Sequence, residues 1–183
     1  TRGMSSAASD VYKRQGYEPG TTKLRNELSA SNTISTDGTI HVFKMKNGIK
    51  FHNGREITAA DVKYSIERVT NPKTQSPGAG FFGMIDGFDA WNAGKGSELS
   101  GVKVIDEKTV EIQLSRPDAT FLHVMALNFA SIVPKEAVDA AGEDFGRKPV
   151  GSGAFKLAEW TPGQRVVFEA FDEYHRTGVP KLE

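Results

Sequence analysis

The sequence contains no cysteine among its 183 residues. Disulfide bonds, thiolate metal sites and a cysteine nucleophile are therefore excluded within this chain, although this absence does not identify the compartment. No stretch has the roughly 20 apolar residues that a transmembrane helix needs, and residues 1–15 lack the apolar centre of a secretory signal. We interpret residues 1–15 as a foreign or disordered tail and exclude them from fold reasoning; a native mobile arm is the alternative.

The sequence also lacks a net charge, because 23 Lys and Arg residues balance 23 Asp and Glu residues. Nucleic acids and anionic membrane surfaces are bound by proteins with an excess of basic residues, so we expect neither as a partner. Hydrophobic residues make up 38% and charged residues 25% of the chain, which is typical of globular proteins. The length suits one domain, or one domain plus part of another.

What the sequence does contain is a series of short elements separated by turn residues. Residues 39–45 alternate in the manner of a strand, and they follow Asp37-Gly38, a dipeptide typical of tight hairpin turns. Apolar residues then recur at helical spacing. We expect this helix to begin after Thr58, to use Asp61 as the partner in a capping box, and to end at the Asn-Pro dipeptide that follows.

The second half of the chain continues the pattern of short strands and helices. It predicts, in order, a long loop with a short helix over 84–93, a hairpin over 101–114, an apolar helix over 120–127, a buried extended piece and a helix over 129–142, and a strand pair over 148–171. The helix within 129–142 is bounded by Pro134 and Gly142. We therefore predict an α/β fold, α+β by strict description, with mainly antiparallel strands and short helices.

Candidate catalytic and metal sites are weak. The four histidines are scattered, and a metal site needs three or four converging donors, so we interpret His52 as a structural residue that packs and bonds a turn. The run PVGSGAF (149–155) lacks the Lys-Ser/Thr ending of a nucleotide loop. A predicted strand follows it, which also argues against Ser152 as a nucleophile on a strand-to-helix elbow. We predict no catalytic residue, no metal ligand and no cofactor.

Three stretches of the chain resemble the family-5 extracellular solute-binding proteins of ABC importers, the dipeptide- and oligopeptide-binding group. They are STDGTIHVFKMKNGIKFHNGREITAADVKYSIERV (35–69), GVKVIDEKTVEIQL (101–114) and PVGSGAFKLAEWTPGQRVVFEAFDEYHRTGVPKLE (149–183). The first carries Lys-Phe-His-x-Gly and Thr-Ala-x-Asp-Val, the second Asp-x-x-Thr-Val, and the third is similar to Pro-Val-Gly-Thr-Gly-Pro-Tyr followed by two strands. The residues that depart from the commoner pattern are Ser152, Ala154, Phe155 and His175.

The resemblance implies a longer protein of the periplasmic-binding-protein-like type II fold, with two lobes that close around a solute. Residues 16–148 would form an inserted domain with part of the first lobe. Residues 149–183 would return into the first lobe, and the chain would be truncated before the second lobe. Such a protein captures peptides or a similar small solute outside the cytoplasmic membrane and delivers them to a permease. It would be periplasmic or extracellular and membrane-anchored, monomeric, partnered by transmembrane permease subunits, and not an enzyme.

The resemblance also suggests where a ligand would lie. The polar-aromatic-small run Asn128, Phe129 and Ala130 corresponds to a region near the ligand in the family, and we take it as a candidate contact; an ordinary buried strand end is the alternative. Phe82, in the pair Phe81-Phe82 on a Gly-rich loop, is the second candidate. The ligand class stays open between a peptide, a nickel chelate, an oligosaccharide and an opine-like compound. A solute-sensing regulatory module with the same fold and a metal-independent hydrolase are the alternative functions.

Overall fold

A four-stranded antiparallel sheet forms the main body of the protein in the computed structural model, which describes residues 15–17 and 24–176. The strands lie in the order β3-β4-β6-β5, and each neighbouring pair is antiparallel. Their bounds are β3 Ser29–Ile34, β4 Ile40–Met45, β5 Val102–Asp106 and β6 Thr109–Gln113. Two further sheets have two strands each, β1 (Gln15–Tyr17) with β2 (Leu24–Asn26), and β7 (Phe155–Thr161) with β8 (Arg165–Ala170).

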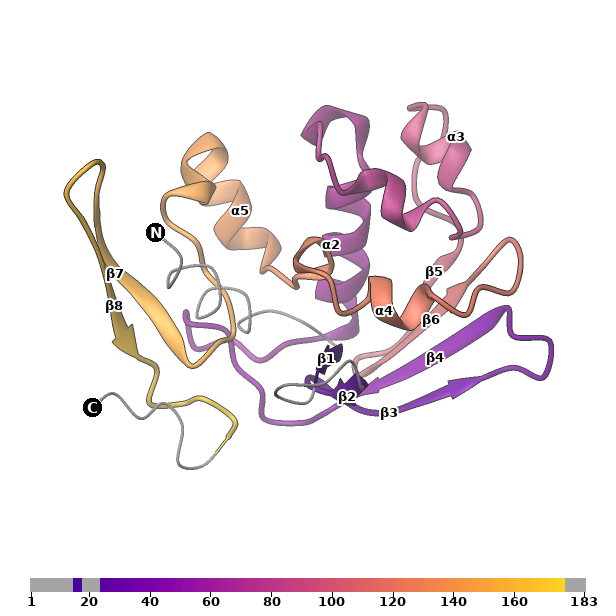
Figure 1. Ribbon diagram of the computed structural model, residues 1–183, viewed down its shortest axis with the longest axis horizontal. Coiled ribbons are helices and arrows are strands. Elements are labelled where there is room, and N and C mark those ends of the chain that lie inside the picture. Colours follow the sequence, from indigo (N-terminus) through magenta and orange to yellow (C-terminus); the bar gives the residue numbers. More distant parts are fainter. Residues whose placement is uncertain (1–14, 18–23, 177–183) are drawn as a thin grey trace.

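Short helices occupy most of the connections between these strands. The α-helices are α2 Ala59–Thr70, α3 Phe88–Asn92, α4 Phe121–Val124 and α5 Lys135–Ala141. The 3-10 helices are η1 Pro72–Thr74, η2 Ala79–Phe82, η3 Asn128–Ala130 and η4 Gly142–Gly146. Figure 1 shows α2 beside the four-stranded sheet and the β7–β8 hairpin at the opposite edge of the molecule, apart from that sheet.

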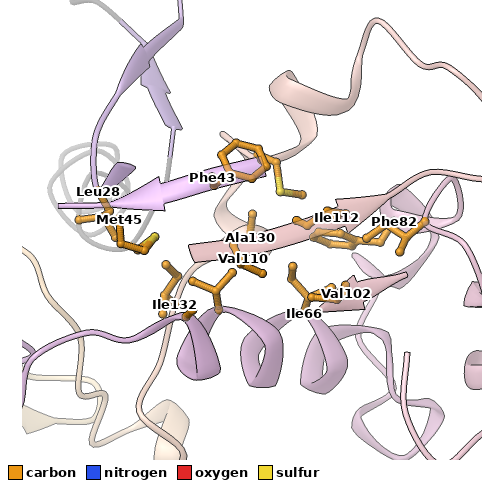
Figure 2. Close-up of a cluster of buried hydrophobic side chains, with 14 of the residues drawn as sticks. Leu28, Phe43, Met45, Ile66, Phe82, Val102, Val110, Ile112, Ala130 and Ile132 are labelled. Carbon is orange, nitrogen blue, oxygen red and sulfur yellow. The ribbon is translucent and has the colours of Figure 1, made fainter. Parts of the chain in front are cut away.

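The hydrophobic core lies between α2 and one face of the sheet (Figure 2). Strand β4 shows why this face is buried: His41, Phe43 and Met45 are buried, while Lys44 between them is exposed, as the period of a strand requires. The core side chains labelled in Figure 2 are Leu28, Phe43, Met45, Ile66, Phe82, Val102, Val110, Ile112, Ala130 and Ile132.

The first turn of α2 is held by a network of charged side chains. A carboxylate oxygen of Asp61 accepts hydrogen bonds from the backbone N–H and the hydroxyl of Thr58, both at 2.9 Å. The guanidinium of Arg55 donates to both oxygens of Asp61, at 2.9 and 2.6 Å. It also donates to Glu136 of α5 at 2.6 Å. These bonds raise the pKa of Arg55, and the bond to Asp61 has the largest effect. The capping box that the sequence predicted is thus also the anchor that joins α2 to α5.

Most predicted elements are confirmed, and the differences have local causes. The strand at 39–45, the hairpin at 101–114, the helix after Thr58 and the strand pair after residue 148 are present. Strand β3 was not predicted, because it is a polar edge strand, with four of its six residues exposed, and shows no apolar alternation. The helix predicted over 84–93 begins only at Phe88, since Gly87 has a φ of 77°, a conformation that a helix does not use.

Candidate ligand-binding surface

The four predicted ligand contacts divide into two exposed and two buried residues. Asn128 and Phe129 are exposed, whereas Ala130 and Phe82 are 4% and 0% exposed and belong to the core. Their neighbour Phe81, which the sequence analysis named together with Phe82, is 48% exposed. The sequence pattern could not tell which ring of this pair faces outward, because a 3-10 turn directs adjacent side chains to different sides.

Residues 128–130 form a 3-10 turn, so their interpretation as a strand end is wrong. The N–H of Ala130 donates to the carbonyl of Leu127 at 3.0 Å, and the N–H of Ser131 donates to the carbonyl of Asn128 at 3.1 Å. The hydroxyl of Ser131 donates to the same Asn128 carbonyl at 2.5 Å. Serine side chains often compete in this way with regular backbone pairing. The chain becomes extended only after this turn, at Ser131.

An aromatic pair on the surface joins η2 to η3. The rings of Phe81 and Phe129 stack with centroids 5.7 Å apart and an interplanar angle of 23°. Both remain exposed, at 48% and 37%. Exposed aromatic side chains that gather at one place are typical of binding surfaces, because they offer a large and rigid apolar area to a partner. We therefore regard this pair as the centre of the candidate site.

Gly78 fixes the position of the Phe129 ring. A Cβ atom at residue 78 would lie 2.2 Å from Cγ of Phe129 and 2.8 Å from its Cβ. No side chain fits there unless the phenylalanine moves, and the backbone at Gly78 has an ordinary φ of −86°. The glycine is needed for space rather than for an unusual backbone conformation. The N–H of Gly78 donates to the hydroxyl of Ser76 at 3.2 Å, which holds the turn.

A hollow of about 430 Å³ lies between η2 and the segment that follows β6. Its lining residues are Gly80, Gly83, Met84, Ser115, Arg116 and Asp118. Asp118 accepts hydrogen bonds from the N–H and hydroxyl of Thr120, at 2.8 and 2.6 Å. These bonds, and more weakly the charge of Arg116, lower the pKa of Asp118. The hollow therefore presents one fixed carboxylate and one guanidinium, which suits polar groups of both signs.

The glycine-rich loop before β7 offers no catalytic arrangement. Ser152 is 1% exposed. Nearby His52 has both ring nitrogens against backbone groups, with Nε2 3.0 Å from the carbonyl oxygen of Gly153 and Nδ1 3.3 Å from the N–H of Gly151. A histidine bonded on both sides is not free to act as a general base, and β7 follows the loop as a strand, as predicted. The geometry supports the structural role expected for His52.

Residues 15–17 and 24–176 form neither a metal-binding cluster nor a membrane-spanning helix. That part of the chain contains no group of three or more His, Asp or Glu residues placed to hold a metal ion. Within the same ranges, no helix combines the length and the apolar character needed to cross a bilayer.

Comparison with known proteins decides the family. The model of the bacterial extracellular solute-binding proteins, family 5, matches residues 23–183. The chain belongs to this family. Its members are periplasmic or extracellular binding proteins, and the resemblance stated from the sequence motifs is confirmed.

The relatives of this family-5 protein are much longer than the chain itself. The dipeptide-binding protein of Escherichia coli K12 is 34% identical over 97% of this chain and 35% of its own length. The glutathione-binding protein GsiB of Pectobacterium atrosepticum is 32% identical, over 88% of this chain and 29% of its own. The substrate-binding domain of an oligopeptide ABC transporter from Bacillus anthracis superposes with a TM-score of 0.85 at 26% identity, over 94% of this chain and 34% of that one. The chain thus spans about a third of the length of these relatives.

Proposed function

We propose that the chain is part of the substrate-binding component of an ABC importer, which captures peptides or a similar small solute outside the cytoplasmic membrane and delivers them to the permease. The observation that carries this proposal is the family match over residues 23–183, together with a fold shared with the substrate-binding domain of an oligopeptide transporter. The partners would be the solute and the transmembrane permease subunits. The protein would act as a monomeric receptor held at the outer side of the membrane. It would bind its solute non-covalently and would not convert it chemically.

The division of the chain into two parts is supported by the state of the β7–β8 hairpin. Trp160, Val167 and Phe168 are 46%, 38% and 40% exposed. Val167 and Phe168 are adjacent in one strand, so they point to opposite faces. A two-stranded sheet with apolar side chains exposed on both faces needs further polypeptide to cover it. We propose that residues 149–183 belong to a lobe that the rest of a longer protein completes, while residues 16–148 form the inserted domain with part of that lobe.

We place the ligand contact of this part of the protein at the Phe81–Phe129 pair and Asn128. An apolar or aromatic side chain of a peptide would lie against the exposed rings, and the hollow beside η2 would accept polar groups. Phe82 and Ala130, the other two predicted contacts, lie directly next to these residues in sequence. From the core they would fix the two 3-10 turns that carry the rings.

Titration calorimetry tests the proposal on two proteins, the 183-residue chain and a chain extended through the remainder of its reading frame. Di- to pentapeptides are the ligands. We expect the extended chain to bind at least one peptide class at micromolar affinity or better, on the order of −8 kcal/mol. The 183-residue chain should bind only weakly, since half a cleft does not exclude water from the ligand. Micromolar binding by the short chain, or binding of another solute but no peptide by the extended one, would contradict this.

A single substitution tests the ligand surface within the extended chain. Gly78→Ala displaces the Phe129 ring and breaks its stack with Phe81, so peptide affinity should fall roughly 3- to 10-fold, the worth of one aromatic contact. Gly146→Ala is the matched control, because a Cβ atom there meets nothing within 4 Å. Equal affinities of the two variants would remove the aromatic pair from the ligand site without affecting the proposed transport function.

A further inference from the structure

One histidine, His52, makes three polar contacts with the loop 151–153. The backbone N–H of His52 donates to the carbonyl of Gly151 at 2.6 Å. The N–H of Gly151 in turn donates to the ring Nδ1 of His52 at 3.3 Å. Nε2 of the same ring lies 3.0 Å from the carbonyl oxygen of Gly153. Three polar contacts across about a hundred residues of sequence thus pass through one side chain and its own backbone.

These contacts determine the protonation state of the ring. An amide N–H can donate only to a nitrogen that carries no proton, so Nδ1 must be bare. A carbonyl oxygen can only accept, so Nε2 must carry the hydrogen. The arrangement is therefore satisfied by the neutral Nε2–H tautomer alone. In the imidazolium form, the new proton on Nδ1 would face the N–H of Gly151, and two donors would oppose each other.

The surroundings of His52 also disfavour a positive charge. The ring is half-buried and packs edge-on against Phe171, with centroids 5.0 Å apart. Burial lowers the pKa of His52, the carbonyl of Gly153 offsets part of this effect, and the charge of Lys156 in β7 adds to the lowering. Lys50, two residues before His52, forms an ion pair with Glu173, two residues after Phe171. That pair joins the segment around His52 to the residues after β8 rather than to the loop 151–153, and it does not involve histidine.

We propose that neutral His52 is a positioning residue that holds the loop 151–153, and with it the start of β7, against residues 50–52, and that protonation of the ring releases this loop. The release is a built-in response to acid, which begins as the pH falls below the ordinary histidine value of about 6.5. It concerns the joint between the two parts of the chain and does not rest on peptide capture. In a closing receptor, such a joint would couple external acidity to the position of the β7–β8 hairpin.

Nitrogen-15 NMR of the 183-residue chain tests the tautomer, and amide hydrogen exchange tests the release. At pH 7.5 we expect His52 to show a protonated Nε2 and a bare Nδ1. Between pH 7.5 and pH 5, the protection factor of the Gly151 amide should fall about tenfold, after correction for intrinsic exchange. The amide of Val110 in β6 is the internal reference for global unfolding. A proton on Nδ1 at pH 7.5, or unchanged protection of Gly151 relative to Val110, would overturn the proposal.

Two variants separate the proton effect from simple loss of packing. His52→Asn keeps an uncharged acceptor near the position of Nδ1, so Gly151 should stay protected and lose its pH dependence. His52→Phe keeps the contact with Phe171 but provides no acceptor, so Gly151 should exchange fast at both pH values. His123→Gln, at an exposed histidine of α4, is the control and should behave like the parent. The same pH dependence in His52→Asn as in the parent would also overturn the proposal.

Discussion

At the scale of single residues, His41 shows what burial costs a polar side chain. Its ring is 3% exposed and lies against Phe121 at 4.6 Å between centroids and against Phe43 at 6.4 Å. Within residues 15–17 and 24–176, neither ring nitrogen has a hydrogen-bond partner of normal geometry. Burial lowers the pKa of His41, and a backbone group of Gly38 offsets only part of this effect. His41 lies on the same strand face as Phe43 and Met45, and this face packs into the core.

The lowered pKa of His41 predicts a stability that declines in acid. The unfolded chain binds the proton more readily than the folded one, so the free energy of unfolding falls as the pH drops below about 6.5. His41→Leu, of similar volume, removes this titration. We expect the free energy of unfolding of the variant, relative to that of the parent, to be about 1 kcal/mol higher at pH 5 than at pH 7.5, measured from urea midpoints. His175, whose pKa is lowered to about 4, titrates in both proteins and cancels. A constant difference between the two proteins would contradict the prediction.

At the scale of an element, the beginning of α2 depends on one carboxylate. Asp61 is 5% exposed and accepts hydrogen bonds from both Thr58 and Arg55. Asp61→Ala removes the cap and leaves the guanidinium of Arg55 without its main partner. We expect a loss of about 2 kcal/mol in the free energy of unfolding, measured by urea denaturation.

The control for this substitution lies on α5. Asp139 is an exposed acidic residue that pairs with Lys135 one turn away. Asp139→Ala should change stability by about 0.5 kcal/mol or less, as is usual for exposed ion pairs on helices. Equal effects of the two substitutions would show that the network around Asp61 does not anchor α2.

The β7–β8 hairpin is expected to be less protected than the four-stranded sheet. It is a two-stranded sheet with exposed Trp160, Val167 and Phe168, and such sheets are marginal in water. In hydrogen exchange at pH 7.5, its amides should exchange through local opening of the hairpin. They should exchange well before the amides of β4 and β6, the strands that contain the buried residues Phe43 and Val110. Protection of the hairpin equal to that of β4 would show that it is stable without further polypeptide.

At the scale of the whole molecule, local sequence patterns predicted the elements that they determine by themselves. They missed the elements that depend on tertiary neighbours. The strand at 39–45 and the capping box of α2 follow from local pattern, and both are confirmed. Strand β3 does not, because only its pairing with β4 makes it a strand. The ligand contacts themselves stay a prediction. Asn128 and Phe129 are exposed, but the ring of the Phe81-Phe82 pair that faces outward is set by the 3-10 turn that packs Phe82 into the core, which the sequence pattern could not predict.

The order of strands in the main sheet has a consequence for how the protein folds. Strand β4 pairs with β6, so that Ile40 lies opposite Gln113, although the chain between them includes α2 and the long loop after it. The hairpins β3–β4 and β5–β6 each close a short loop, whereas the central pair must close a long one at a greater entropic cost. Assembly therefore ends with the docking of two preformed hairpins. During synthesis, the edge of β4 that pairs with β6 has no strand partner until residue 113 has left the ribosome.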